Sequence, residues 1–492
     1  MSNSFVNAMK GESAWGKTWN GADALTTTLN KVLDMFGRAG AVRNLSVADK
    51  KLMFKEAFEE DATLALRCLF YVRDIRGGYG ERDTFTDMLQ WLADEHPDVV
   101  EKNLWAVLEY GRAKDLYCLV RTKAEKAMWA FMKSQFELDR ANMAEGKSIS
   151  LLAKWIATPD AKSEKTATLG KKTAKELGYS FKTMRDYKRI LRDMRKYLDI
   201  PEAKMCAGKW EEIEYSHVAS QCMIKHRRAF SRHDEDRYDA YLEAVKSGKA
   251  NMNTGTMNPV DILYNVRTNY TADLDIMWSK LTDYCKGNAL VMCDTSGSMT
   301  WSVRSGAQPI DVAISLSMYF AERNKGPLTN MFMTFESNPH LVDIRGINLL
   351  EKYRNIMNAP WGGSTDLEAA FNHLLEICKR SNVSAEDMPE ALIIVSDMQI
   401  NCVRGMDGDR CTFYDAMAKR FEDAGYKMPQ IVFWNVNAEN ATFHASADVH
   451  GATLVSGYSP AIFKTVMESI GSSPVELMLK VLNSPRYAEI TA

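Results

Sequence analysis

The sequence lacks several features that would narrow its function at once. None of its nine cysteines lies in a Cys-x-x-Cys pair and their number is odd, which argues against a disulfide framework and against a zinc site. No run of about 18 apolar residues occurs, and the first residues, MSNSFVNAMKGES, carry no apolar signal-peptide core. We therefore expect a soluble, cytoplasmic (intracellular) protein with reduced thiols and no membrane partner.

The chain also has almost no net charge. The net charge of −2 over 492 residues indicates no class of partner. Any partner therefore has to be inferred from local clusters of charged residues. The hydrophobic fraction of 46% excludes a disordered chain, and the length predicts two or three domains.

The most informative stretch is an apolar segment, residues 289–293, that leads into the loop DTSGS at residues 294–298. Mg²⁺ prefers about six oxygen ligands, and one carboxylate with two hydroxyls at alternate positions can supply three of them from one side. Gly297 lets the backbone turn so that the neighbouring hydroxyls converge.

Two later segments also place an oxygen-bearing side chain at the start of a helix or the end of a strand. The turn WGGSTD at residues 361–366 places Thr365 just before a predicted helix, and an apolar strand over residues 391–396 is followed by Asp397. Ligands of open α/β sheets bind at the carboxyl edge of the strands, where these side chains are expected to meet. Alternatively, the loop hydroxyls only cap the helices that follow.

The order Asp-x-Ser-x-Ser, then Thr, then Asp resembles a von Willebrand factor A domain with a complete metal-ion-dependent adhesion site (MIDAS). The resemblance implies that Asp294, Ser296 and Ser298 hold a Mg²⁺ ion (or Mn²⁺ or Ca²⁺) directly. It also implies that Thr365 joins directly in one state and that Asp397 acts directly or through water. A partner protein would then supply a carboxylate to the ion. Met299 and Trp361 flank the site, where they would contact that partner or pack under the loop.

Strands and helices alternate through the C-terminal part, which predicts an α/β, Rossmann-like, doubly wound sheet over residues 286–473. The strand at residues 340–344 is expected at an antiparallel edge. The predicted strands cover residues 289–293, 330–335, 340–344, 392–396, 431–435 and 453–455, and the helices cover residues 310–322, 367–380, 415–424 and 460–469. A C-terminal helix and tail follow over residues 474–492.

The N-terminal half has a different pattern. Residues 1–44 are rich in Gly, Asn, Ser and Thr and predict a loosely held N-terminal extension. Residues 45–285 are predicted to be all-α, and two glycine turns with charged residues, at residues 73–83 and 109–116, separate helices in a similar way. This recurrence favours HEAT-like helical repeats. An irregular helical domain is the alternative.

Residues 162–196 hold twelve basic and four acidic residues, and many of the basic ones recur at helical spacing. Such a stripe suits a nucleic-acid backbone, and the interleaved Tyr179, Phe181, Tyr187 and Tyr197 could stack on unpaired bases. Alternatively, the stripe is a solvated helix face that pairs with acidic residues. The candidate nucleic-acid contacts are Lys171, Lys172, Lys175, Lys182, Arg185, Lys188, Arg189, Arg192, Arg195, Lys196, Arg227 and Arg228.

A helical region followed by such an A domain resembles the Ro autoantigen and its bacterial relatives, the TROVE group. The motifs RDIRGGYGER, YGRAKDL, AKWIATP and WGGSTD resemble more closely a TROVE-related family of phages, bacteria and plants. The resemblance implies a Ro-like scaffold whose helical repeats bind non-coding or single-stranded RNA, as a ribonucleoprotein.

Two other functions are open on the residues. One is a metal-dependent protein adaptor or phage particle component that binds no nucleic acid. The other is a metal-dependent hydrolase, which usually needs a water-activating base or a second metal ion. None of the three ligand segments contains a histidine, so we expect no enzyme and assign no catalytic residue.

Overall fold

The computed structural model describes residue 9 and residues 11–285, 287–301, 307–334, 339–359, 365–401 and 411–492. Its contacts divide the chain into two compact units. Unit 1 comprises Met1–Val72, Arg76–Thr84 and Thr254–Ala488, and unit 2 comprises Arg73–Ile75, Phe85–Asn253 and Glu489–Ala492. These divisions differ from the expected boundaries after residues 44, 285 and 473, since the N-terminal segment and the C-terminal helix both belong to unit 1.

Unit 1 is built on a six-stranded sheet with the order β5-β4-β3-β6-β7-β8. β5 is antiparallel to β4, as expected for the edge strand, and the other neighbouring strands are parallel. From β3 the chain proceeds to one edge of the sheet and then returns to β6 on the other side of β3, so the topological switch point lies between these two strands. The strands are β3 (Ala289–Cys293), β4 (Met331–Thr334), β5 (Leu341–Asp343), β6 (Ala391–Ser396), β7 (Gln430–Asn435) and β8 (Ala452–Ser456).

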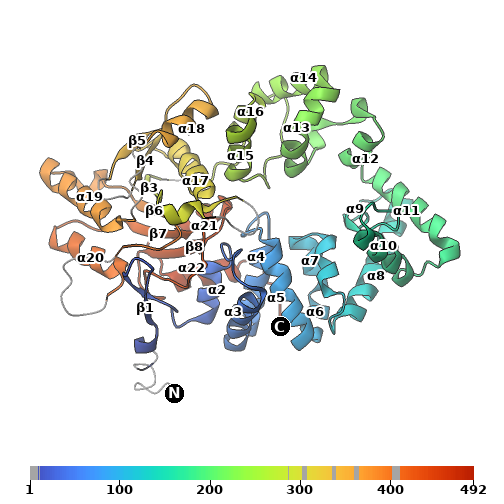
Figure 1. Ribbon diagram of the computed structural model, residues 1–492, viewed down its shortest axis with the longest axis horizontal. Helices are drawn as coiled ribbons and strands as arrows, with labels where there is room; N and C mark the ends of the chain where they lie inside the picture. The colour runs from blue at the N-terminus through green and yellow to red at the C-terminus, as the bar shows by residue number, and fades with distance from the viewer. Residues whose placement is uncertain are drawn as a thin grey trace. The chain divides into compact units, whose positions relative to one another are not determined.

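Helices surround this sheet, which explains the uninterrupted apolar runs of β3 and β6 (Figure 1). Met292 and Phe433 pack in one cluster with Phe371 of helix α19 (Leu367–Ser381) and Phe413 of helix α20 (Phe413–Asp423). The next residue of β7, Trp434, contacts Phe320 of helix α17 (Pro309–Arg323) with 5.4 Å between ring centroids. Successive residues of a strand point to opposite faces, so the sheet has a core on each side.

The helices predicted for the C-terminal part are present, and α18 is an additional one. The helices of unit 1 are α2 (Lys31–Arg38), α3 (Val47–Glu60), α4 (Ala62–Arg73, whose last residue is in unit 2), α15 (Pro259–Asn269), α16 (Asp273–Ser279), α17 (Pro309–Arg323), α18 (Leu349–Met357), α19 (Leu367–Ser381), α20 (Phe413–Asp423), α21 (Ala461–Met467) and α22 (Pro474–Leu482).

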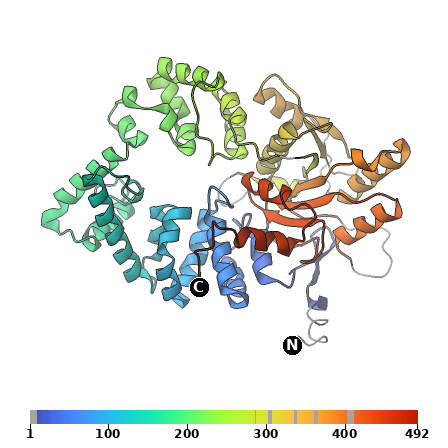
Figure 2. The same cartoon turned by 180° about the vertical axis from the view of Figure 1, so that it is seen from behind.

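The N-terminal segment is packed on the sheet from residue 14 onward, and the expectation of a loosely held extension is wrong there. β1 (Trp15–Lys17) and β2 (Asp23–Leu25) form an antiparallel hairpin. Leu25 and Phe443 exchange two backbone hydrogen bonds of 3.0 and 2.8 Å, and the Gly40 N–H donates to Ser456 Oγ at 3.0 Å. α2 lies beside α22 and β8, which Figure 2 shows from behind.

Unit 2 is helical, and many of its helices pack on sequence neighbours: α6 on α7, α8 on α9, and α13 on α14. This pattern is compatible with helical repeats, and the HEAT-like repeat stays a prediction. Its helices are α5 (Arg82–Glu95, whose first turn is in unit 1), α6 (Pro97–Lys102), α7 (Leu104–Tyr110), α8 (Glu125–Ala144), α9 (Leu152–Trp155), α10 (Glu164–Glu176), α11 (Met184–Tyr197), α12 (Pro201–Cys206), α13 (Ser220–His233) and α14 (Glu235–Lys246).

Within the part of the chain that the structure describes, no helix is both long enough and apolar enough to cross a membrane.

Candidate functional site

Four of the five predicted cation ligands meet at the switch point of the sheet. Asp294 follows β3, and its Oδ1 accepts a hydrogen bond from the Ser296 N–H at 2.9 Å. The Ser296 and Ser298 hydroxyl oxygens lie 3.1 Å apart. Asp397 follows β6, and its carboxylate accepts a hydrogen bond from the Ser298 side chain. Two carboxylates and two hydroxyls from separate segments thus converge.

Both carboxylates are buried, Asp294 fully and Asp397 at 3% exposure. Burial and then the charge of Asp397 raise the pKa of Asp294. Burial also raises the pKa of Asp397, against the opposing effect of the hydrogen bond from Ser298. Like charges at close range in a dry site cannot both ionise without cost, and a bound cation would remove that cost.

Ser396, which the sequence reasoning did not single out, holds one of these carboxylates. It is the last residue of β6, and its Oγ donates to Asp294 Oδ2 at 2.5 Å. In the register of the sheet, Cys293 of β3 pairs with Val395 of β6, so the next residues of the two strands are neighbours. The adjacency of two parallel apolar strands was the available signal for this contact.

Thr365, the fifth predicted ligand, is tied through its backbone to the segment that follows Asp397. Its carbonyl accepts a hydrogen bond from the Asn401 N–H at 3.1 Å, four residues beyond Asp397. The following Asp366 caps α19 by accepting from the Ala369 N–H at 2.9 Å. Met299 is fully buried and therefore packs under the loop. Trp361 lies outside the described residues.

The donor set fits a hard cation. Carboxylate and hydroxyl oxygens are ligands of Mg²⁺, Ca²⁺ and Mn²⁺, whereas zinc and copper sites rely on cysteine and histidine. Among the described residues, no group of three or more His, Cys, Asp and Glu side chains is arranged to hold a metal ion. A cation at the switch point would therefore depend on the hydroxyls as well as on Asp294 and Asp397.

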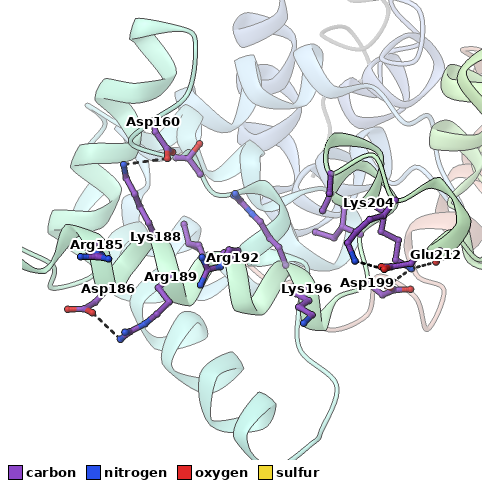
Figure 3. Close-up of a pocket in the computed structure, with 17 residues that line it drawn as sticks. Asp160, Arg185, Asp186, Lys188, Arg189, Arg192, Lys196, Asp199, Lys204 and Glu212 are labelled. Atoms are coloured by element: carbon purple, nitrogen blue, oxygen red, sulfur yellow. Dashed lines mark hydrogen bonds and ion pairs between the residues drawn. The ribbon is translucent and has the colours of Figure 1, made fainter. Parts of the chain in front are cut away.

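A second candidate site is a basic groove in unit 2. Its volume is about 1120 Å³, and α11 lines much of it. Figure 3 shows Arg185, Arg189 and Arg192 toward one side, with Lys204 and Asp199 toward the other. Six of the twelve predicted nucleic-acid contacts line this groove: Arg185, Lys188, Arg189, Arg192, Arg195 and Lys196.

Acidic residues neutralise part of this groove. Lys188 pairs with Asp160 at 3.4 Å, and Arg189 pairs with Asp186 at 3.0 Å. These side chains are between 43% and 62% exposed, and surface pairs of this kind contribute at most about 1 kcal/mol. The basic partners can therefore exchange a carboxylate for another anion at little cost.

Three others of the predicted contacts are engaged or buried. The Arg195 guanidinium donates to the Ala153 and Ile156 carbonyls at 2.8 and 3.1 Å, so it stabilises the end of α9. Arg227 is only 3% exposed, which removes it from any surface for nucleic acid. Lys172 forms an ion pair with Glu125. The remaining predicted contacts outside the groove are exposed: Lys171, Lys175, Lys182 and Arg228.

The predicted aromatic contacts differ among themselves. Tyr187 is fully buried against Phe136 and Tyr179, with ring centroids 6.3 and 5.1 Å away, so its proposed role in base stacking is wrong. Phe181, by contrast, is 94% exposed. Tyr197 is also exposed and donates from its hydroxyl to the Lys147 carbonyl.

Two family models match successive parts of the chain. The family model described as Domain of unknown function (DUF2828) matches residues 18–142 and 130–289, which together span more than half of the chain. The chain belongs to the DUF2828 family. A second model, Domain of unknown function (DUF7788), matches residues 288–482, so in this DUF2828 protein the two models overlap at residues 288 and 289, where β3 begins.

This DUF2828 protein is 26% identical over 511 aligned residues to Uncharacterized protein L728 of Acanthamoeba polyphaga mimivirus, over 94% of its own length and 86% of that protein. Among solved structures, it is similar to the RO (RSR) protein of Deinococcus radiodurans. That alignment covers 89% of this chain and 93% of that one, with 15% identity and a TM-score of 0.47.

Proposed function

We propose that this DUF2828 protein is a non-enzymatic, Ro-like RNA-binding scaffold that also presents a divalent cation to a protein partner. The observation that carries the RNA part is the groove of unit 2, which basic side chains of α11 line together with Lys204 and Lys209. Phosphates on a nucleic-acid backbone bind such a lining by displacing counterions. Single-stranded RNA suits it best, since exposed Phe181 precedes α11 and offers a face for a base.

In this proposal, unit 1 carries a von Willebrand factor A domain with an adhesion-type site. Asp294, Ser296 and Ser298 would hold Mg²⁺, Mn²⁺ or Ca²⁺ directly, with Thr365 and Asp397 completing the site. A bound ion supplies an open coordination position for an anionic oxygen. The convergence of four of these side chains at the switch point supports the proposal.

The sequence motifs shared with the TROVE-related family support the combination of the two sites in one chain. They specify no RNA sequence. Contacts to a backbone position an RNA without reading its bases, so we expect modest sequence preference.

A second candidate function is a metal-dependent protein adaptor without nucleic acid. The pairing of Lys188 and Arg189 with carboxylates favours it, because these pairs reduce the positive potential of the groove. The two candidates differ in a simple respect. An adaptor loses its partners to EDTA and keeps them after RNase treatment.

The experiment is a gel-shift titration of the purified chain with a single-stranded oligouridylate at increasing salt. We expect binding that weakens steeply with salt and falls at least about tenfold with Arg189→Glu/Arg192→Glu. The matched control is Lys126→Glu/Lys133→Glu, which makes the same charge change on exposed residues of α8 outside the groove. Absent binding, or equal loss in both variants, would remove the RNA part of the proposal.

A further inference from the structure

Two exposed tryptophans from distant parts of the sequence meet beside the candidate cation site. Trp19 and Trp301 have ring centroids 4.9 Å apart, with their planes at 48°. They are 57% and 50% exposed. Large aromatic side chains left in contact with water are costly for a monomer and are frequent energetic centres of protein interfaces.

Trp19 is held in place by the segment that follows Asp397. Its backbone N–H donates to Gln399 Oε1 at 3.0 Å, and the neighbouring Thr18 Oγ1 donates to the Ile400 carbonyl at 2.7 Å. The Gln399 N–H in turn donates to Asp397 Oδ1 at 3.2 Å. The hairpin of β1 and β2 thus brings Trp19 to the edge where Asp397 lies.

Trp301 is held by the other loop of the site. Its backbone N–H donates to the Ser298 carbonyl at 3.2 Å, at the end of a short 3₁₀ turn over Gly297–Thr300. Each tryptophan is therefore tied to a loop that carries a candidate ligand. The two rings therefore meet between the loop that carries Ser298 and the segment that follows Asp397.

Among the described residues, the chemistry of the β1–β2 hairpin favours a polypeptide over a nucleic acid. Lys17 is the basic residue of the β1–β2 hairpin, and it already pairs with Asp23 at 2.9 Å. The hairpin thus offers the exposed ring of Trp19, and its cation is already paired. An acidic side chain would satisfy the ion, and a large apolar side chain next to it would cover the two rings.

We propose that Trp19 and Trp301 form the specificity-determining rim of the cation site and bind an aromatic or long aliphatic side chain that neighbours the acidic residue of a partner polypeptide. The inference rests on the proposed cation site and names the class of partner that this site accepts. It assigns a binding role to the N-terminal hairpin, which lies outside the segments that hold the ion.

The test uses the full chain and a phage-displayed library of random dodecapeptides, selected in the presence of Mn²⁺. We expect enriched peptides in which Asp or Glu is adjacent to Trp, Phe or Leu, and whose binding is lost in EDTA. Trp19→Ala/Trp301→Ala should weaken the binding of a selected peptide at least about tenfold. Tyr264→Ala, an aromatic residue of unit 1 that is 51% exposed on α15, is the matched control and should bind normally.

Mn²⁺ binding is measured on every variant, so that the two proposals fail separately. If the wild-type chain binds no Mn²⁺, the cation site itself fails. If Mn²⁺ binds and the tryptophan variant keeps its peptide affinity, the proposed binding role of Trp19 and Trp301 is wrong. Selected peptides that carry an acidic residue without an apolar neighbour would also contradict the proposed role of the tryptophans. So would an oligouridylate that competes with the peptide and whose binding depends on the same two tryptophans.

Discussion

Ser396 donates a hydrogen bond to the Oδ2 of Asp294 at 2.5 Å, so the last residue of β6 orients the carboxylate that follows β3. The two strands are parallel neighbours on either side of the switch point. In the proposed cation site this contact would orient the Asp294 carboxylate toward the ion, as groups behind metal ligands do in many sites.

Replacing Ser396 by alanine should therefore weaken Mn²⁺ binding by about 10- to 100-fold without removing a direct ligand. The measurement is a titration followed by the electron paramagnetic resonance signal of free Mn²⁺. Ser315→Ala is the matched control, because Ser315 is also buried but donates to the Val312 carbonyl within α17. Unchanged affinity in Ser396→Ala would show that this hydrogen bond does not orient the carboxylate.

The packing of the N-terminal segment makes Gly40 sensitive to substitution. A Cβ at this position would lie 2.7 Å from the Ser456 carbonyl oxygen of β8. Gly40→Ala should thus lower the free energy of unfolding by about 1–3 kcal/mol, the usual range for overpacking. Urea denaturation measures this, with Gly255→Ala as a control in open space. Equal stability of the two variants would contradict the packing of this segment on β8.

Arg195 and Arg192 lie on the same helix and should respond differently to alanine. Arg195 donates to two carbonyls of α9 and its C-cap, and burial lowers its pKa. Arg195→Ala should cost about 1.5–3 kcal/mol of stability through these charge-assisted bonds. Arg192, whose side chain is 75% exposed, should change stability by less than about 0.5 kcal/mol. Thermal unfolding compares them, and similar shifts in both variants would contradict the assignment.

His444 predicts a pH dependence of unit 1. It is buried, its Nε2 lies 2.9 Å from the Met398 carbonyl oxygen, and burial lowers its pKa from 6.5 to about 4. The unfolded chain binds the proton more readily than the folded one, so stability is full above pH 6.5. It decreases as the pH falls toward 4, by on the order of 3 kcal/mol from this group.

Urea unfolding at several pH values tests this prediction. His444→Gln should flatten the acid limb of the stability curve, and His373→Gln, a partly exposed position of α19 in the same unit, is the control. An acid limb of the same steepness in His444→Gln would assign the pH dependence to other groups.

The sheet and the convergence of Asp294, Ser296, Ser298 and Asp397 followed from the sequence, because buried parallel strands are uninterrupted apolar runs and their carboxyl ends share one edge. Local pattern was sufficient there. In α11 the same kind of local pattern predicts that Tyr187 is buried, because Tyr187 shares its helical face with buried Leu191 and Met194. The interpretation of Tyr187 as a stacking residue did not use that pattern.

Other features depend on contacts between residues far apart in the chain. The pairing of Leu25 with Phe443 places a three-residue strand on the sheet, and strands this short carry no periodicity to detect. The meeting of Trp19 with Trp301 depends on that placement. Arg195 differs from its exposed neighbours only in facing α9, which spacing along a helix does not specify when the neighbouring helix is unknown.

The most direct test of the account is Mn²⁺ binding to the purified chain, followed by the resonance signal of the free ion, for the wild type and for Asp294→Ala and Asp397→Ala. The account predicts one EDTA-sensitive Mn²⁺ per wild-type chain, displaced by excess Mg²⁺ and lost in both variants, with a rise in the wild-type melting temperature on binding. A wild-type chain that binds neither ion, or an Asp294→Ala variant that binds as tightly as the wild type, would contradict it.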